Sequence, residues 1–597
     1  MLKFLFFGII VLFSLSLQAT NDLALEYIKD LSIHVPEAGS FLGLSEYDNQ
    51  VGFIQKNQDD VEGRFNTRWR NRLDEELSNL KATHGNNLEE MSLESHETYV
   101  EILNLQRKCD ANLKVLEQNE KYARLTIPNT YFNAMFDAID PVMFIFIQTF
   151  LLLQERGVDA ATQRFNLYLY GQDDNPPFIQ GVQQYLETKI AQYIQKDKKI
   201  LYPPRKQIQS MIAQANKLKF LAPFALTKLW GATSKTWHFW SQVNNYIWFL
   251  EQKILPHCTD DYALPEDLYK AYMNLQGIYV DDPKILAEEA LKHFENAHKE
   301  FSDLSIGLSA KYNTVSALPN EIMNELKIKT AVKSQDEALI LYKDTAKDLE
   351  NIIRNNDLFD LPESEMSVRL SGTLEGMVVQ ASRCTPPKVF NNHGRFRPEL
   401  VLADWKNNGN KFSAHFLTAH EGRPGHELHF SSILDQDQNY LRTNLLFDFA
   451  TIEGWACYAE HALLPFFAHE EQRISELDFQ RYISLKAALC IQLMLGEKNQ
   501  AEIKDALMTE LDIPETLADT AIARFAGNLG LAQAICYYYG QQRLVKLKEE
   551  LEQKLGDKFN LKEFHNAVLS YGILSIDLSA PLIERKLRGD DSHEFEM

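Results

Sequence analysis

The sequence has no C-x-x-C pair and no excess of positive charge, and each absence excludes a class of protein. Its six cysteines are isolated from one another, so a thiolate metal site has no support. Acidic residues outnumber basic ones and give a formal net charge of −22, which repels nucleic acid. We therefore expect no nucleic-acid partner. We also expect the cysteines to be buried as small apolar residues, with one disulfide at most.

Long apolar runs are absent except at the N-terminus. Lys3 precedes an apolar run from Phe4 to Leu17, and the small residue Ala19 follows it. This order predicts a signal peptide over residues 1–19, with no stable membrane span after cleavage. An uncleaved anchor is the alternative, because Leu17 fits the small-residue rule poorly. No cysteine follows the run, which argues against lipid attachment there. We expect the mature protein to be periplasmic or secreted.

Most of the remaining chain has helical periodicity and contains no internal repeat or linker. Apolar residues recur at helical spacing over residues 283–301, behind Asp282 and Pro283 as N-cap and first-turn proline, and again over residues 88–116. Two short β-like runs stand at 366–383 and 396–404. We predict a mainly α fold, a large helical single unit with a small β element beside the helix that carries His420.

The stretch "LTAHEGRPGHELHF" (417–430) combines a His-Glu pair with a second histidine at an unusual spacing. On an unbroken helix, the six-residue separation would place His420 and His426 about 120° apart. Pro424 and Gly425 disrupt regular helix, so we expect them to bulge it by about two residues and bring His426 back beside His420. The pattern then offers two metal ligands with Glu421 beside them as a general base. A chance combination of these residue types is the alternative.

Two further carboxylates, Glu453 and Glu460, stand seven residues apart and therefore on one helical face. Carboxylates on an otherwise apolar helix are costly to bury unless they are paired or bind a metal. These carboxylates can supply a third ligand, and Glu453 lies 27 residues after His426, a distance suited to a helix-loop-helix return. The alternative is an exposed acidic edge.

These two motifs together resemble the bacterial DUF885 family. The matching residues are His420-Glu421-Gly422-Arg423-Pro424-Gly425-His426 and Glu453-Gly454-Trp455-Ala456-Cys457-Tyr458-Ala459-Glu460. The likeness continues through Arg524, residues 532–544 and residues 559–574. It thus assigns residues 20–597 to a DUF885-like metallopeptidase domain whose motif-bearing part is about 366–597. Three positions depart from the family pattern: Gly422, Glu427 and the segment Leu529-Gly530-Leu531.

The resemblance implies a zinc-dependent peptidase with an active site similar to that of the gluzincin oligopeptidases. It assigns Zn²⁺ to His420, His426 and Glu453, and the general base to Glu421. We expect Glu460 to support these ligands from behind. Tyr537 is implied as the donor to the developing oxyanion, although Tyr538 or Tyr539 can take the role instead.

Arg524 and His565 are the candidate substrate-binding residues. Arg524 can bind the C-terminal carboxylate of a peptide or neutralise an internal acid. A lone helical histidine such as His565 is more often simply packed, and the resemblance alone raises it to a candidate. The run from Phe396 to Asp404 can offer an edge strand to a peptide backbone.

The expected function is hydrolysis of peptide bonds in short peptides, through zinc-activated water and a glutamate base, by an exported enzyme. The runner-up is a non-catalytic zinc-containing protein that binds peptides. A non-haem iron centre uses the same ligand types, but iron oxygenase sites generally occur in β-barrels rather than helical proteins.

Overall fold

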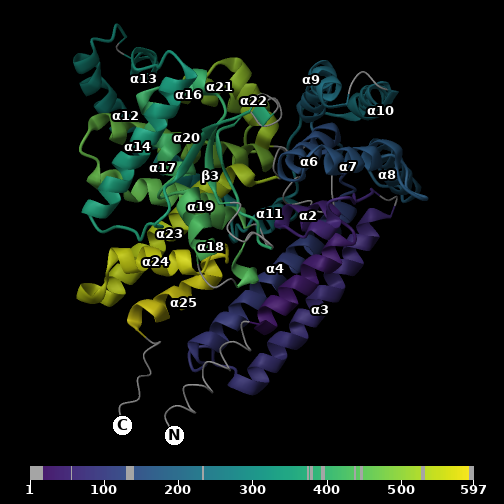
Figure 1. The fold of residues 1–597 in the computed structure, drawn as a ribbon, viewed down its shortest axis with the longest axis horizontal. Helices are drawn as coiled ribbons and strands as arrows, with labels where there is room; N and C mark the ends of the chain where they lie inside the picture. Colours follow the sequence, from purple (N-terminus) through teal and green to yellow (C-terminus); the bar gives the residue numbers. More distant parts are fainter. Residues whose placement is uncertain are drawn as a thin grey trace.

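The computed structural model describes most of the chain, and the fold is mainly α-helical, as predicted (Figure 1). The described residues are 18–54, 57–128, 140–230, 234–316, 318–372, 375–376, 381–390, 397–435, 439–443, 448–525 and 531–589. The predicted signal peptide falls largely on residues 1–17 and so lies outside them. Among the described residues, no helix is both long enough and apolar enough to cross a membrane.

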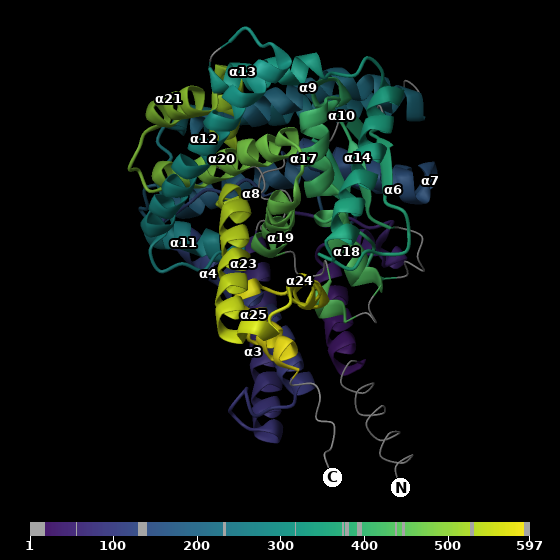
Figure 2. The ribbon, with the colours of Figure 1, turned by 90° about the vertical axis from the view of Figure 1, so that its left-hand side faces the viewer.

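The N-terminal part of the described chain forms a helical pair and a peripheral group of helices (Figures 1 and 2). The pair α3 and α4 packs side by side at one end of the molecule. The peripheral group α6 to α10 has its own apolar core. The bounds are α2 (Pro36–Leu42), α3 (Gln58–His84), α4 (Leu93–Lys121), α6 (Pro141–Arg156), α7 (Val158–Tyr170), α8 (Phe178–Gln195), α9 (Arg205–Trp230) and α10 (Ser234–Phe249).

The larger body contains the remaining helices around the buried helix α20. Its bounds are α11 (Glu266–Leu275), α12 (Pro283–Tyr312), α13 (Pro319–Lys329), α14 (Gln335–Asn355), α16 (Trp405–Asn408), α17 (Lys411–Glu421), α18 (His426–Asp435), α19 (Phe449–Ala462), α20 (Glu470–Met494), α21 (Gln500–Leu511), α22 (Glu515–Phe525), α23 (Gln533–Leu555), α24 (Leu561–Ser570) and α25 (Ile576–Arg588).

The helical periodicity read from the sequence is confirmed in α12. Asp282 caps this helix through a 2.9 Å bond from the Lys284 backbone N–H, and Pro283 occupies its first turn. Its predicted apolar face is buried at Ala287, Ala290, Phe294 and Phe301. All six cysteines are buried and free of disulfide bonds, so they pack as small apolar residues, as expected.

The β element is a three-stranded sheet of order β1-β3-β2, formed by Ser367–Leu370, Glu399–Leu402 and Arg383–Thr385 respectively. β1 runs parallel to β3, and β2 runs antiparallel to it. Because β3 is paired on both sides, the expectation that the 396–404 run offers an edge strand is wrong. The strand with an outer edge near the metal-ligand motif is β2.

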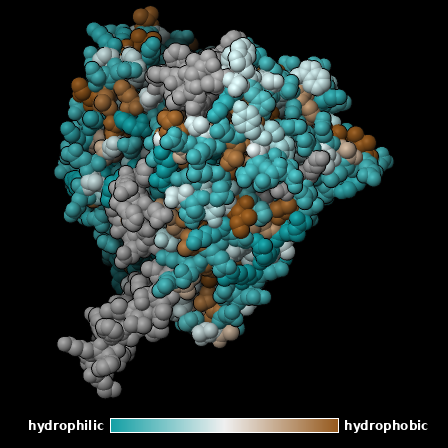
Figure 3. Space-filling view, turned by 45° about the vertical axis from the view of Figure 1, so that its right-hand side comes forward, coloured by the Kyte–Doolittle hydropathy of each residue, from teal (hydrophilic) through white to brown (hydrophobic). Residues whose placement is uncertain are grey.

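Polar residues cover most of one face of the molecule (Figure 3). The face in Figure 3 is largely hydrophilic, with apolar residues scattered over it. A net charge of −22 favours a soluble, self-repelling surface of this kind.

Candidate metal centre

The His-Glu motif lies where one helix ends and the next begins. α17 stops at Glu421, and α18 starts at His426, so Pro424 and Gly425 break the helix rather than bulging it. The Gly425 backbone N–H donates to Ala419 at 2.9 Å. A Cβ at Gly425 would lie 1.9 Å from the His420 carbonyl oxygen, so only glycine fits at this position of the turn between α17 and α18. The imidazoles of His420 and His426 end 4.9 Å apart, as the motif predicted.

Glu453, on α19, completes a cluster with these histidines. Its Oε2 atom lies 3.3 Å from His426 Nε2 and 3.7 Å from His420 Nε2. One donor atom from each of the three side chains falls within 4.8 Å of the others. Two imidazole nitrogens and one carboxylate are the donor set of catalytic zinc sites.

The electrostatics of the cluster favour a bound cation. Burial raises the pKa of Glu453, but hydrogen bonds to His420 and His426 lower it to about 2. Burial lowers the pKa of His420, but the charge of Glu460 and hydrogen bonds to Cys457, Glu453 and Glu460 raise it well above its ordinary value. The carboxylate of Glu453 thus stabilises a positive charge beside it, so the residues present fit a divalent metal. Burial and the charge of Glu476 raise the pKa of Glu460 to about 8, against the opposing effect of His420.

Glu460 supports the cluster from behind, as expected from its position on the Glu453 face. Its Oε1 atom lies 3.1 Å from His420 Nδ1, which leaves Nε2 directed at Glu453. A carboxylate on the second ring nitrogen fixes the tautomer and orientation of a metal-binding histidine. His420, Cys457 and Glu460 form a second group of possible ligands, but burial raises the pKa of the Cys457 thiol and keeps it protonated.

His429, the other histidine of the motif region, points away from the cluster. Its Nε2 atom lies 2.9 Å from the Gly572 carbonyl oxygen, and its side chain is buried. At the departure position Glu427, the carboxylate pairs with buried Arg423, which also contacts Glu350 at 2.8 Å. Glu427 therefore holds the turn between the two helices.

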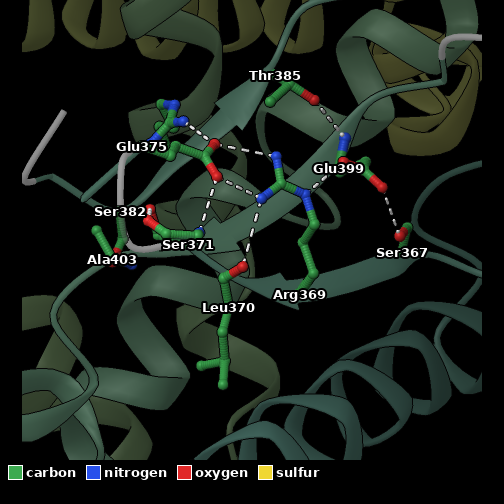
Figure 4. Close-up of polar contacts among 11 residues, drawn as sticks. Ser367, Arg369, Leu370, Ser371, Glu375, Ser382, Thr385, Glu399 and Ala403 are labelled. Carbon is green, nitrogen blue, oxygen red and sulfur yellow. Dashed lines mark hydrogen bonds and ion pairs between the residues drawn. The ribbon is translucent and has the colours of Figure 1, made fainter. Parts of the chain in front are cut away.

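Glu421 is held by the sheet. The Cys384 backbone N–H, on the outer edge of β2, donates to Glu421 Oε2 at 2.8 Å. β2 is itself tied to its neighbours by buried Glu375, which pairs with Arg369 at 2.7 Å and with Arg383 (Figure 4). This network makes the sheet a rigid support for the expected base.

The same network reaches β3. Arg369 Nε donates to Glu399 Oε2 at 2.8 Å, and the Glu399 backbone N–H donates to the Thr385 hydroxyl at 3.1 Å (Figure 4). Charged contacts thus join all three strands on one side of the sheet. They supply the cohesion that such short strands lack.

Tyr537 is the tyrosine that faces the cluster. Its ring stacks beside the His420 ring at 6.3 Å, and its hydroxyl accepts a 3.1 Å bond from Gln533 Nε2. Burial and the charge of Glu453 raise its pKa, so it remains a phenol that can donate a proton. Tyr538 instead contacts His293, and Tyr539 donates to the Tyr279 carbonyl and to Asp577.

The two candidate substrate-binding residues lie in different surroundings. His565 is fully buried, with Nδ1 2.7 Å from the Leu358 carbonyl oxygen and Nε2 2.9 Å from the Tyr458 hydroxyl. Both its nitrogens contact protein groups, so the structure places it in the core rather than among the cluster. Arg524 is exposed on α22, close enough for its charge to act on Tyr482 of α20.

The sequence alone did not indicate that aromatic residues of α20 lie against the metal-ligand cluster. The centre of the Phe479 ring lies 5.5 Å from that of the His420 ring, and the centre of the Phe416 ring lies 5.8 Å from that of the same His420 ring. Phe479, Tyr482 and Lys486 have spacings of three and four and so share one helical face. That stripe was the available signal, but aromatic residues at helical spacing ordinarily indicate core packing.

The fold and site define a mainly α-helical protein with a buried His-His-Glu cluster of metal-ligand type. The chain belongs to the family described as "Bacterial protein of unknown function (DUF885)", whose model matches residues 36–580. The predicted family is thereby confirmed. No curated protein matches the chain.

Two solved structures share the fold. One is described as a "putative lipoprotein of unknown function" from Shewanella oneidensis, with 15% identity, a TM-score of 0.69, and coverage of 94% of this chain and 98% of that one. The other is described as the "putative lipoprotein" from Colwellia psychrerythraea, with 15% identity, a TM-score of 0.73, and coverage of 96% and 100%. At this identity the likeness concerns the fold alone.

Proposed function

We propose that the protein is a zinc-dependent peptidase that hydrolyses short peptides. The observation that carries the proposal is the convergence of His420 Nε2, His426 Nε2 and Glu453 Oε2, with Glu421 and Tyr537 beside them. A structural metal site has no need of an adjacent base or phenol. The arrangement therefore favours hydrolysis over a purely structural role.

Zinc held by His420, His426 and Glu453 would polarise a substrate carbonyl and lower the pKa of water. The carboxylate of Glu421 accepts a proton from the attacking water and passes it to the departing amine. A C–O bond forms as the peptide C–N bond breaks, leaving a carboxylate and an amine. The Tyr537 hydroxyl donates a hydrogen bond to the oxygen that becomes negative.

The sheet positions the base in this scheme, because the Cys384 N–H holds Glu421 at the edge of β2.

We further propose that the protein acts outside the cytoplasm, because Lys3 and the apolar run after it are typical of an export signal. Sequencing the N-terminus of the protein recovered from cell fractions tests this. Cleavage near Ala19 supports export, and an intact Met1 on cytoplasmic protein contradicts it.

The central test compares Glu421→Gln with Glu453→Gln. Glu421→Gln keeps the metal ligands but loses the base, so peptide hydrolysis should fall about 10²–10⁴-fold while zinc content stays near one per chain. Glu453→Gln should lose zinc and activity together. The measurements are metal analysis and digestion of a peptide library, with and without a chelator.

Two results count against the proposal. If Glu421→Gln cleaves peptides as fast as the parent, the assigned base is wrong. If the zinc-loaded parent cleaves nothing in a broad library but binds peptides, the protein is the non-catalytic peptide-binding alternative.

A further inference from the structure

One face of α20 extends from the metal-ligand cluster to the ammonium group of Lys486. Phe479, beside His420, is followed at helical spacing by Tyr482 and Lys486. The Lys486 ammonium lies 4.5 Å from the centre of the Tyr482 ring and 5.9 Å from that of Tyr537. Tyr537 in turn stacks beside His420, so Lys486 stands one side chain away from the cluster.

Lys486 is half-buried, and no carboxylate lies within ion-pair distance of it in the part of the chain that the structure describes. Two other half-buried lysines are paired with carboxylates: Lys504 contacts Glu515 at 2.8 Å, and Lys198 contacts Glu120 at 3.0 Å. A cation removed from water without an acidic partner is costly. Its environment therefore favours an anion supplied by a ligand.

Two neighbours strengthen this positive region. Lys486, and to a lesser degree Arg524, lower the pKa of Tyr482 through their charges. The Tyr482 hydroxyl is thus a good hydrogen-bond donor beside two cations. A lysine, an arginine and a tyrosine form a group suited to a carboxylate.

We propose that Lys486, with Tyr482 and Arg524, binds the C-terminal carboxylate of the substrate, and that the enzyme is a carboxypeptidase. This inference rests on the proposed peptidase function. The ring of Tyr537 lies 6.3 Å from that of His420 and 5.9 Å from the Lys486 ammonium. At about 3.3 Å per residue, that span fits release of roughly one to three residues.

The charges argue against the opposite orientation. A free peptide N-terminus would place an ammonium beside Lys486 and Arg524, which repel it. An acidic side chain is the other source of a carboxylate at Lys486, and the experiment below distinguishes it from the chain terminus.

The test uses zinc-loaded protein and three peptides of one neutral sequence. The first ends in a free carboxylate, the second ends in an amide, and the third ends in an amide but has glutamate in place of its last residue. Mass spectrometry identifies the products. Cleavage of the first peptide near its C-terminus, at least about tenfold faster than the second and third, supports the proposal.

Substitutions then assign the effect to Lys486. For the free-acid peptide, Lys486→Met should raise KM and lower kcat/KM about 10–100-fold, whereas Lys486→Arg should retain most of the activity. Zinc content should not change in either variant. Lys343→Met is the matched control, because Lys343 is exposed on α14 and should leave all rates unchanged.

Several outcomes overturn the inference. Equal cleavage of the free-acid and amidated peptides removes the carboxylate requirement while leaving the peptidase function intact. Preference for the amidated glutamate peptide assigns Lys486 to a side chain instead. Unchanged kinetics in Lys486→Met removes Lys486 from binding. If the parent cleaves peptides of the broad library but none of these three, this inference fails alone; if it cleaves nothing in the library, the proposed function fails with it.

Discussion

A single methyl group at Gly540 should separate the two helices that carry Glu453 and Tyr537. α19 and α23 cross at Gly454 and Gly540, and a Cβ on Gly540 would lie 1.8 Å from the Ala450 carbonyl oxygen and 2.7 Å from Gly454 Cα. Ordinary contact begins at 3.4 Å, so Gly540→Ala must move α23 outward by about 1.5 Å.

That movement should act on catalysis more than on metal binding. Tyr537 stands less than one turn before Gly540 on α23, whereas His420, His426 and Glu453 all belong to other helices. A displacement of about 1 Å can cost 10²-fold in rate, so kcat/KM should fall by about that factor. Zinc content should remain near one per chain, and unfolding free energy should fall by about 1–3 kcal/mol.

The assay combines peptide hydrolysis, metal analysis and urea denaturation of full-length protein. Gly307→Ala is the matched control: Gly307 lies on α12, and a Cβ there meets nothing within 4 Å. This control should keep full activity and gain about 0.5–1 kcal/mol of stability from higher helix propensity. Parental kcat/KM in Gly540→Ala would refute the claim that this contact positions Tyr537.

Two other predictions concern buried carboxyl groups. Glu460→Gln should weaken zinc binding about 10–100-fold in chelator competition, because it disturbs the group that orients His420; unchanged affinity would remove Glu460 from the site. Burial raises the pKa of Asp140 to about 7, against the opposing hydrogen bonds from Val142 and Met143. Its contribution to stability is therefore present below about pH 4 and lost as the pH rises through 7. The unfolding free energy of Asp140→Asn minus that of the parent should therefore increase by up to about 4 kcal/mol from pH 4 to pH 8. An equal difference at pH 4 and pH 8, measured by urea denaturation, would contradict this.

The local pattern of the sequence determined the helical class and the composition of the cluster. Periodicity in residues 283–301 predicts α12 because a helix must bury one face, and the Pro-Gly pair predicts that His426 turns back toward His420. Glu453 and Glu460 share a face because seven residues make nearly two full turns. These features depend on neighbours in the chain.

Only the tertiary structure decided the rest. Three consecutive tyrosines point 100° apart on α23, and the close approach of Gly540 to Gly454 selects Tyr537 for the site. His565 is enclosed by the Leu358 carbonyl and Tyr458, partners that no spacing near it indicates. Lys486 lies one side chain from the cluster because α20 packs against α17 and α23, and the sequence alone does not indicate which distant helices pack together.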